Sequence, residues 1–379
     1  MPKLKITQAS VPEGVIDLGV GQPQVDLLPL KILKTAAEYQ FHQADANILQ
    51  YGMQQGDANL RCVLANFLGQ EYGVPVDQGS LLITAGVSQA LDLICSLMTR
   101  PGDTIIVEEP SYFLALRIFG DHHLNIVGTP MDEYGLIISA LEDNIKKFNP
   151  KLVYTMPVFH NPTGVTLPAD RRADLARLSE RHDFLVVADE VYQLLAYTNE
   201  PPPPMTTFDT AGHVISLGSF SKILAPGLRL GWMHAHREVL EPFLMCGLLD
   251  SGGGLNPFNS SIVSSAIELG LQKENLLHLK DVYRTRRDIL SRALRAQIPV
   301  LDFRVPDGGF FIWARFKDET EAAAVLASAV RYDVGFQPGS RFSSMNGLNT
   351  YLRFCFTYYD SGDLVEGVQR LARAMDAAG

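Results

Sequence analysis

The sequence contains little cysteine. Its 379 residues include four cysteines, Cys62, Cys95, Cys246 and Cys355, and no two of them form a C-x-x-C pair. The spacing therefore gives no sign of a metal site or of a redox-active dithiol built on cysteine. Four scattered thiols suit a reducing compartment, and we expect the protein to be cytoplasmic.

Long apolar runs and an excess of positive charge are absent as well. No uninterrupted apolar stretch is long enough to span a bilayer, and the first residues, MPKLKITQAS, lack the apolar core of a signal peptide. Lysine and arginine number 32 against 42 aspartates and glutamates, a net charge of −10. A field of this sign repels phosphate backbones and anionic lipids, so we expect neither nucleic acid nor a membrane as a partner.

The composition is otherwise that of a folded globular protein, with 46% hydrophobic and 20% charged residues. Between residues 82 and 235, apolar runs such as TIIVEE, KLVYTMP, FLVVADE and HVISLGSF alternate with helical stretches. Strands that are apolar throughout and separated by helices indicate a mostly parallel sheet covered on both faces. We therefore predict a large α/β domain with three layers, α/β/α.

The pattern changes after about residue 238. Longer helical segments follow, VLEPFLMCGLL and residues 262–290. Short strands such as GGFFIWARF and TYLRFCF come next, with amphipathic helices near residues 322–330 and 364–375. This order predicts a smaller α+β domain. We place an N-terminal arm at residues 1–40, the large domain at 41–260 and the small C-terminal domain at 261–379.

The strongest signal for chemistry is the segment SFSKILAPGLRLGW, which follows a predicted strand. It places Lys222 between the hydroxyls of Ser219 and Ser221 and the guanidinium of Arg229. A lysine in apolar surroundings near other positive charge has a lowered pKa, and its neutral amine can form a Schiff base. The hydroxyls and the guanidinium supply the donors and the cation that a phosphate monoester needs. A lysine alone would be interpreted as a solvated surface residue.

This S-x-S-K-x-x-x-P-G-x-R-x-G-W pattern closely resembles that of the fold-type I pyridoxal-phosphate (PLP) enzymes of the class I/II aminotransferase family. The resemblance extends from about residue 16 to the C-terminus. It implies that pyridoxal 5'-phosphate is the cofactor, that Lys222 holds it covalently, and that Ser219, Ser221 and Arg229 bind its phosphate. The subgroup it suggests includes 2-aminoadipate, kynurenine and broad-range aminotransferases.

Asp189 stands at the carboxyl end of a predicted buried strand, where open α/β sheets bind their ligands. A carboxylate there can keep the ring nitrogen of the cofactor protonated, which lets the ring accept electrons. A capping aspartate at a strand-to-helix turn is the alternative interpretation. The resemblance implies that Tyr192, and Asn161 of HNPTG, contact the ring hydroxyl oxygen. Without it, residues 161–164 would indicate only a turn.

Gly86, Val87 and Ser88 open a run with apolar residues at helical spacing, so they mark a helix N-terminus. Free backbone N–H groups and the helix dipole favour phosphate there, although a simple capped helix gives the same pattern. The resemblance assigns these residues to the phosphate site. It also implies that Tyr112 of EEPSYF stacks on the cofactor ring, where a tyrosine after a strand otherwise indicates packing alone.

Arg353 is a charged residue in an otherwise apolar strand, where an unpaired guanidinium would be costly. Either an anionic ligand or an internal ion pair would balance it. The resemblance implies that Arg353 binds the substrate α-carboxylate, with Gly21 and Asn161 near the bound amino acid. It also implies that Tyr51 reaches the phosphate in the neighbouring subunit, so that a homodimer shares its active sites.

The function that follows is transfer of an amino group between an amino acid and a 2-oxo acid in a ping-pong cycle. Lys222, Asp189 and Tyr192 would be the catalytic residues. Two alternatives use the same residues: a β-eliminating carbon–sulfur lyase, and a non-catalytic sensor that binds the cofactor or an amino acid. Apolar Leu27 and Leu28 predict a pocket that accepts large or aromatic side chains. No second arginine is identifiable for a side-chain carboxylate, which argues against strict aspartate specificity.

Overall fold

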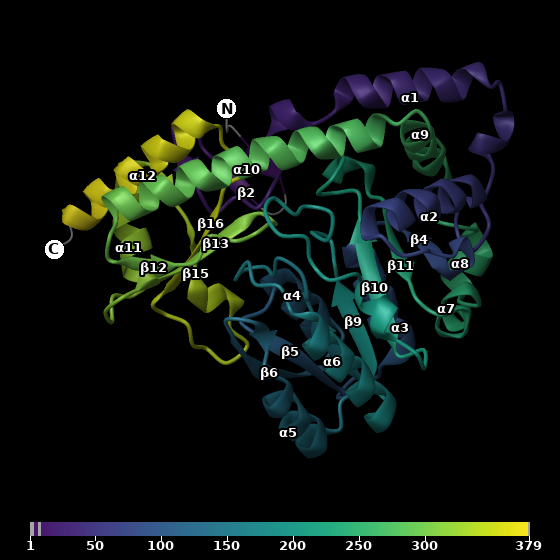
Figure 1. Ribbon diagram of the computed structural model, residues 1–379, viewed down its shortest axis with the longest axis horizontal. Helices are drawn as coiled ribbons and strands as arrows, with labels where there is room; N and C mark the ends of the chain where they lie inside the picture. The colour runs from purple at the N-terminus through teal and green to yellow at the C-terminus, as the bar shows by residue number, and fades with distance from the viewer. Residues whose placement is uncertain (1–3, 7–8, 378–379) are drawn as a thin grey trace.

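The computed structural model describes residues 4–6 and 9–377. Its largest sheet has eight strands in the order β4-β11-β10-β9-β8-β5-β6-β7 (Figure 1). The strands are β4 (Leu81–Thr84), β5 (Thr104–Glu109), β6 (Asn125–Asp132), β7 (Gly135–Leu136), β8 (Leu152–Thr155), β9 (Leu185–Asp189), β10 (Val214–Ser219) and β11 (Gly231–His234). β10, β9, β8, β5 and β6 run parallel, β11 is antiparallel to β10 and β4, and β7 is antiparallel to β6. The predicted mostly parallel sheet is confirmed.

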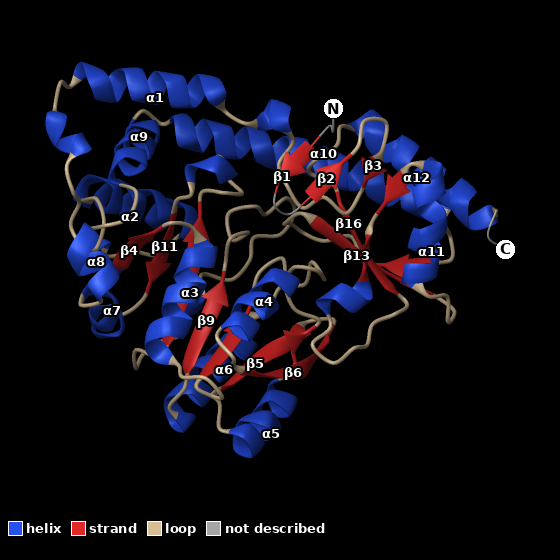
Figure 2. Ribbon diagram, turned by 180° about the vertical axis from the view of Figure 1, so that it is seen from behind, coloured by secondary structure: helices blue, strands red, loops and turns tan. Residues whose placement is uncertain are grey.

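Helices cover both faces of this sheet, and successive side chains along its central parallel strands enter different cores. In β5, Ile105 and Val107 belong to the core that also contains residues of α3 (Val87–Met98) and α4 (Phe113–Asp121). Ile106 belongs to the core that contains residues of α5 (Ile138–Phe148) and α6 (Ala169–His182). Figure 2 shows the helices on the two sides of the sheet, which confirms the three-layer prediction.

A smaller antiparallel sheet forms a second unit. It has four strands in the order β12-β13-β16-β15: β12 (Leu301–Phe303), β13 (Phe311–Phe316), β16 (Tyr351–Cys355) and β15 (Gln337–Pro338). The helices α10 (Leu271–Gln297), α11 (Ala322–Ala329) and α12 (Ser361–Asp376) pack together beside it (Figure 1). This confirms a smaller α+β unit built mainly from the C-terminal part of the chain.

The N-terminal segment joins this second unit. β3 (Ile16–Asp17) pairs in parallel with β14 (Val334–Gly335), and β1 (Leu4–Ile6) pairs with β2 (Ala9–Val11). α1 (Leu30–His42) then packs against α9 (Pro257–Glu268). The remaining helices are α2 (Ala58–Tyr72), α7 (Arg237–Leu244) and α8 (Gly247–Gly252). The exact domain boundaries at residues 40 and 260 remain a prediction.

Two elements differ from the sequence-based prediction. The helical stretch expected over residues 262–290 is two helices, because Gly270 has φ +75° and separates α9 from α10. The second difference is β6, which the sequence pattern does not predict and whose side chains are mostly half-buried or exposed. Its sequence, NIVGTPMD, lacks the continuous apolar character of the central strands.

Candidate active site

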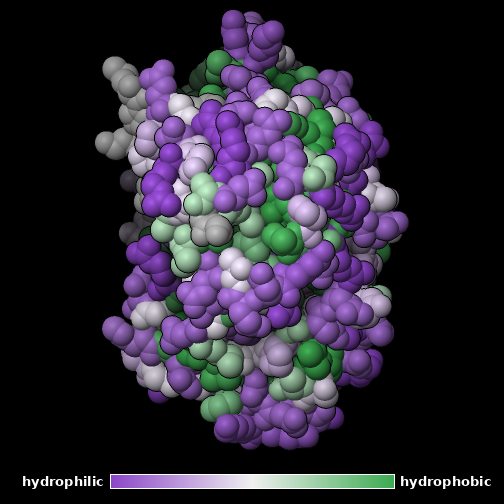
Figure 3. Space-filling model, turned by 90° about the vertical axis from the view of Figure 1, so that its left-hand side faces the viewer, coloured by the Kyte–Doolittle hydropathy of each residue, from purple (hydrophilic) through white to green (hydrophobic). Residues whose placement is uncertain are grey.

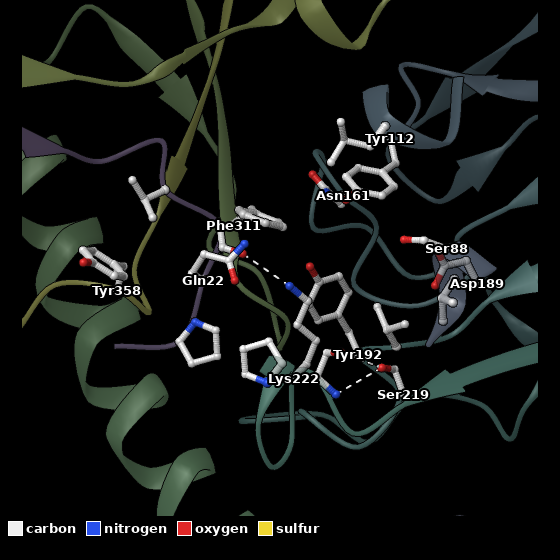
Figure 4. A pocket seen from close by; sticks show the side chains of 18 of the residues that line it. Gln22, Ser88, Tyr112, Asn161, Asp189, Tyr192, Ser219, Lys222, Phe311 and Tyr358 are labelled. Atoms are coloured by element: carbon white, nitrogen blue, oxygen red, sulfur yellow. Dashed lines mark hydrogen bonds between the residues drawn. The ribbon is translucent and has the colours of Figure 1, made fainter. Parts of the chain in front are cut away.

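A cavity of about 540 Å³ lies at the carboxyl ends of the parallel strands. Residues that follow β5, β9 and β10 line it, together with residues of β13 and β16 and of the segment after β3. It brings together most of the predicted site: Gly21, Val87, Ser88, Tyr112, Asn161, Asp189, Tyr192, Ser219, Ser221, Lys222, Arg229 and Arg353. Figure 4 shows that the labelled side chains reach it from separate segments of the chain.

Lys222 extends into this cavity from the loop after β10 (Figure 4). Its Nζ donates a hydrogen bond of 3.3 Å to the carbonyl oxygen of Gly21 and lies 5.3 Å from the ring centroid of Phe310. Desolvation lowers the pKa of Lys222 to about 8, and the positive charges of Arg353 and Arg229 act in the same direction. A substantial fraction of this amine is therefore neutral near physiological pH and able to act as a nucleophile.

Asp189 is the last residue of β9 and is buried. Its Oδ2 accepts a hydrogen bond of 2.9 Å from the Tyr154 hydroxyl, whereas its Oδ1 has no hydrogen-bond partner within residues 4–6 and 9–377. Burial raises the pKa of Asp189 to about 6, and the hydrogen bond from Tyr154 opposes that rise. A buried carboxylate oxygen without a donor is costly. The protonated ring nitrogen of PLP is a group that would satisfy it.

A cradle for a phosphate lies where α3 begins. Gly86 caps α3 with φ +85°, and a Cβ added there would come within 2.7 Å of Arg229 Nη2. The backbone N–H groups of Val87 and Ser88 are in the first turn, where a helix offers free donors. Ser219 Oγ lies 3.0 Å from Ser221 Oγ. Backbone donors, two hydroxyls and one guanidinium fit the phosphate of the cofactor.

Arg353 also lines the cavity and is buried on β16. Its Nη1 donates to Asn161 Oδ1 and its Nη2 to the carbonyl oxygen of Gly19, both at 2.8 Å. Both acceptors are neutral, and no acidic side chain in the described part of the chain forms an ion pair with it. Its Nε has no hydrogen-bond partner there either. The internal ion pair weighed from the sequence is therefore not formed among residues 4–6 and 9–377, and the charge is available to an anion.

Two tyrosines complete the walls. Tyr192 is buried, with ring centroids 5.2 Å from Phe310 and 6.0 Å from Phe311. Tyr112 caps α4, and desolvation raises its pKa to about 12. The pKa of Tyr192 also lies well above its usual range because the residue is buried. Both hydroxyls therefore stay protonated at neutral pH and can donate hydrogen bonds.

Of the other predicted residues, Tyr51 and Leu27 are not among those that line the cavity. Tyr51 is 83% exposed, on the loop that precedes α2, and does not contribute to the cavity of its own chain. Leu28 lines the cavity, whereas Leu27 packs against the hydrophobic core.

The sequence analysis did not single out two residues of the site. Phe311 lies with its ring centroid 4.0 Å from Arg353 Cζ, and Tyr154 binds Asp189. Tyr154 belongs to an apolar strand run, KLVYTMP, in which a tyrosine is not distinctive. Only the parallel pairing of β8 with β9 brings its hydroxyl to Asp189.

Comparisons with known proteins agree with this geometry. The family model for class I and II aminotransferases matches residues 13–371. The chain is 33% identical over 378 residues to aromatic-amino-acid aminotransferase 1 of Thermococcus litoralis, covering 98% of this chain and 90% of that protein. It is 31% identical over 378 residues to the 2-aminoadipate transaminase of Thermus thermophilus, covering 98% and 92%. A crystal structure of kynurenine aminotransferase from Pyrococcus horikoshii superposes with a TM-score of 0.89 at 32% identity, covering 96% and 91%.

The fold and these similarities define a PLP-dependent transferase of fold type I. Because the family model covers most of the chain, the chain belongs to the class I and II aminotransferase family, and its activity is PLP-dependent transamination. The comparisons favour neither a lyase nor a non-catalytic sensor.

Proposed function

We propose that the cavity residues carry out transamination between an amino acid with a large apolar or aromatic side chain and a 2-oxo acid. The observation that carries the proposal is the presence, in one cavity, of the Lys222 amine and of buried Asp189, whose Oδ1 accepts no hydrogen bond from the residues that the structure describes. An amine of lowered pKa and a carboxylate that faces a ring nitrogen are the two groups that this cofactor requires from a protein.

When bound, PLP supplies an aldehyde that joins to amines and a ring that accepts electrons from the substrate α-carbon. Lys222 is the residue that would hold this group covalently. Its Nζ, with a pKa of about 8, can accept the proton from the substrate α-carbon and donate it back. Asp189 would hold the proton on the ring nitrogen, and Tyr192 with Asn161 would donate to the ring hydroxyl oxygen.

Arg353 binds and orients the substrate carboxylate. Its guanidinium is buried, its hydrogen-bond acceptors are neutral, and its Nε has no hydrogen-bond partner in the described part of the chain. Asn161 Oδ1 and the carbonyl oxygen of Gly19 fix the plane of the guanidinium, so the carboxylate would be bound in one orientation. Gly21 lets the Phe311 ring and the Arg353 guanidinium approach the backbone closely, since a Cβ there would lie 3.1 Å from Phe311 and 3.5 Å from Arg353 Nη2.

The remaining wall of the cavity indicates the substrate side chain. It is mainly apolar, with Val25, Leu28, Leu91, Leu114 and Ile118 among its residues. The only cations among the described lining residues are Lys222, Arg229 and Arg353, each with a role already proposed. A second carboxylate would therefore enter apolar surroundings without a counter-charge, which is costly. Similarity to an aromatic-amino-acid aminotransferase points to the same class of substrate.

A cytoplasmic homodimer completes the proposal. Phe41, Leu49, Tyr51, Met53 and Leu248 are large hydrophobic side chains that are 55% or more exposed. They belong to the end of α1, the loop before α2, and α8, which lie at one end of the molecule (Figure 1). A second copy of the chain would cover this surface and bring its Tyr51 to the phosphate cradle.

A single-turnover screen tests the proposed reaction and substrate class. The purified holoenzyme is mixed with each of the twenty amino acids, aminoadipate and kynurenine, without an oxo acid, and the absorption of the bound cofactor is followed. We expect phenylalanine, tyrosine and leucine to convert the cofactor at least about tenfold faster than aspartate, because the apolar pocket binds apolar side chains more favourably than a carboxylate.

Ammonia is measured in the same mixtures. Stoichiometric conversion of the cofactor without ammonia release is expected of a transaminase. Continued release of ammonia and keto acid without an acceptor would instead identify a lyase, and no spectral change with any amino acid would identify a sensor. Aspartate reacting faster than phenylalanine would contradict the proposed substrate class.

A further inference from the structure

We propose that Tyr154 is a positioning residue, which holds the carboxylate of Asp189 charged and oriented toward the ring nitrogen of the cofactor. The role depends on the function proposed above, since it concerns the same cavity. Tyr154 is not among the residues that line that cavity, so it would act through Asp189, to which it is hydrogen-bonded.

The contact is buried on both sides. Tyr154 lies on β8, which pairs in parallel with β9, and its hydroxyl donates to Asp189 Oδ2 at 2.9 Å. The exposed fractions of Tyr154 and Asp189 are 0% and 2%. The Tyr154 ring packs edge-on against Phe119, with centroids 5.2 Å apart, so the hydroxyl is fixed in place. Water cannot easily replace this donor.

The two carboxylate oxygens of Asp189 differ in their hydrogen bonding. Oδ2 is occupied by Tyr154, and Oδ1 is the oxygen without a donor in the described part of the chain. Tethering one oxygen fixes the rotation of the carboxylate about its terminal bond. The free oxygen is therefore held ready for a donor that enters the cavity.

The hydrogen bond also favours the charged form of the carboxylate. Burial raises the pKa of Asp189 to about 6, and the charge of neighbouring Glu190 acts in the same direction. The hydrogen bond from Tyr154 and the charge of Lys222 oppose this rise. The other titratable groups that face Asp189 are Tyr112 and Tyr192, both protonated at neutral pH. Removing the Tyr154 hydroxyl therefore moves the titration of Asp189 toward neutral pH.

The test compares wild-type holoenzyme with Tyr154→Phe, which removes the hydroxyl and keeps the ring. Each protein is dialysed at a series of pH values from 5 to 9, and the retained PLP is measured by absorbance after denaturation. The cofactor is held more weakly once Asp189 is protonated, so retention falls on the acid side. We expect the midpoint of this fall to move up by roughly one pH unit in Tyr154→Phe, as the loss of a hydrogen bond to an ionised group predicts.

Two further comparisons separate positioning from packing. In the Asp189→Asn background, adding Tyr154→Phe should leave the whole profile of PLP retention against pH unchanged, because the titrating carboxylate is gone. Phe119→Leu disturbs the packing of the Tyr154 ring and keeps the hydroxyl, so its midpoint should match that of the wild type. Thermal unfolding of each holoenzyme shows whether it is folded.

The outcomes are distinct. A midpoint that is the same in wild type and Tyr154→Phe overturns the proposal. So does an equal loss of cofactor at every pH, which is the signature of a purely structural role. A shift that persists in the Asp189→Asn background also overturns it. Wild-type protein that retains no PLP at any pH would overturn the proposed function instead.

Discussion

At the residue scale, the chemistry depends on a few side chains whose ionisation is altered by burial. Desolvation lowers the pKa of Lys222 and raises that of Asp189, so each group titrates much closer to neutrality than it does in water. Such opposite shifts within one cavity are typical of sites that move protons. The two changes have one main cause, the burial of both groups away from water.

The shifted lysine gives a direct prediction for the apoenzyme. Raising the pH converts the ammonium of Lys222 to the neutral amine, which is the form that attacks an aldehyde. The rate of covalent attachment of added PLP, followed by absorbance, should therefore rise with pH and level off above a midpoint near 8. A midpoint near the ordinary lysine value of about 10.5 would show that the amine is well solvated.

Some residues of the site could be predicted from a local sequence pattern, and others could not. Lys222, Ser219, Ser221 and Arg229 lie within eleven residues of one another, so a local pattern predicted them together. Tyr154 was missed because its role depends on the hydrogen bond across two strands, and no local pattern marks a tyrosine in an apolar strand. Hydrogen-bond partners that are distant in sequence become visible only in the folded chain.

At the element scale, close backbone contacts position the loop that carries Tyr51. A Cβ added to Gly253 would lie 2.2 Å from the carbonyl oxygen of Gly52, and one added to Gly254 would lie 2.1 Å from that of Met53. These distances are too short for any side chain, and the obstructing atoms belong to the backbone. The segment between α8 and α9 therefore fixes the position of residues 52–56.

Gly254→Ala should destabilise the protein for this reason. We expect a loss of about 1–3 kcal/mol in the free energy of unfolding, the usual cost of overpacking a tight site. Gly252→Ala is the matched control, because a Cβ there meets nothing within 4 Å. Urea unfolding of the two variants measures the difference. Equal stabilities would mean that the loop moves aside without cost.

The strands and helices themselves were easier to predict from sequence than their boundaries. Central strands such as β5 and β8 to β10 are buried on both faces and so are continuously apolar. β6 was not predicted because its side chains are partly exposed and its sequence therefore mixes polar with apolar residues. The break at Gly270 depends on a positive φ. A glycine permits this conformation, but its presence in the sequence does not predict it.

At the scale of the whole molecule, the site exists only because distant parts of the chain meet. Arg353 and Asn161 are hydrogen-bonded although they are 192 positions apart in the sequence. Arg353 lies on β16 of the small sheet, and Asn161 lies on the loop that follows β8 of the large sheet. Strand and helix patterns in the sequence predicted the layered fold. Only the family resemblance predicted that Arg353 and Asn161 share one site. None of the helices in residues 4–6 and 9–377 has the length and apolar character needed to cross a bilayer.

The surface differs between the two ends of the molecule. The face drawn in Figure 3, on the side of the small sheet, is mainly hydrophilic, with apolar residues in small separate patches. The exposed hydrophobic side chains near Tyr51 belong to elements at the other end in Figure 1. This asymmetry supports the proposal that the end with Tyr51 pairs with a second copy.

Hybrid dimers test that proposal. When chains with Lys222→Ala are mixed with chains carrying Tyr51→Phe, each hybrid contains one cavity with both native residues. We expect Tyr51→Phe homodimers to bind PLP about tenfold more weakly, as loss of one charge-assisted hydrogen bond predicts, and the hybrid to regain wild-type affinity at one site per dimer. Hybrids that bind no more tightly than the Tyr51→Phe homodimer would show that Tyr51 does not serve the partner's site.

The central claim is that the amine of Lys222 holds PLP in the cavity beside Asp189, and chemical reduction tests it most directly. Treating the holoenzyme with borohydride converts the lysine linkage to a stable bond, and mass spectrometry of the digested protein locates the phosphopyridoxyl group. We predict a single modified peptide, labelled at Lys222 and absent from Lys222→Ala. A label on another lysine, or no label on protein that has bound the cofactor, would contradict the account.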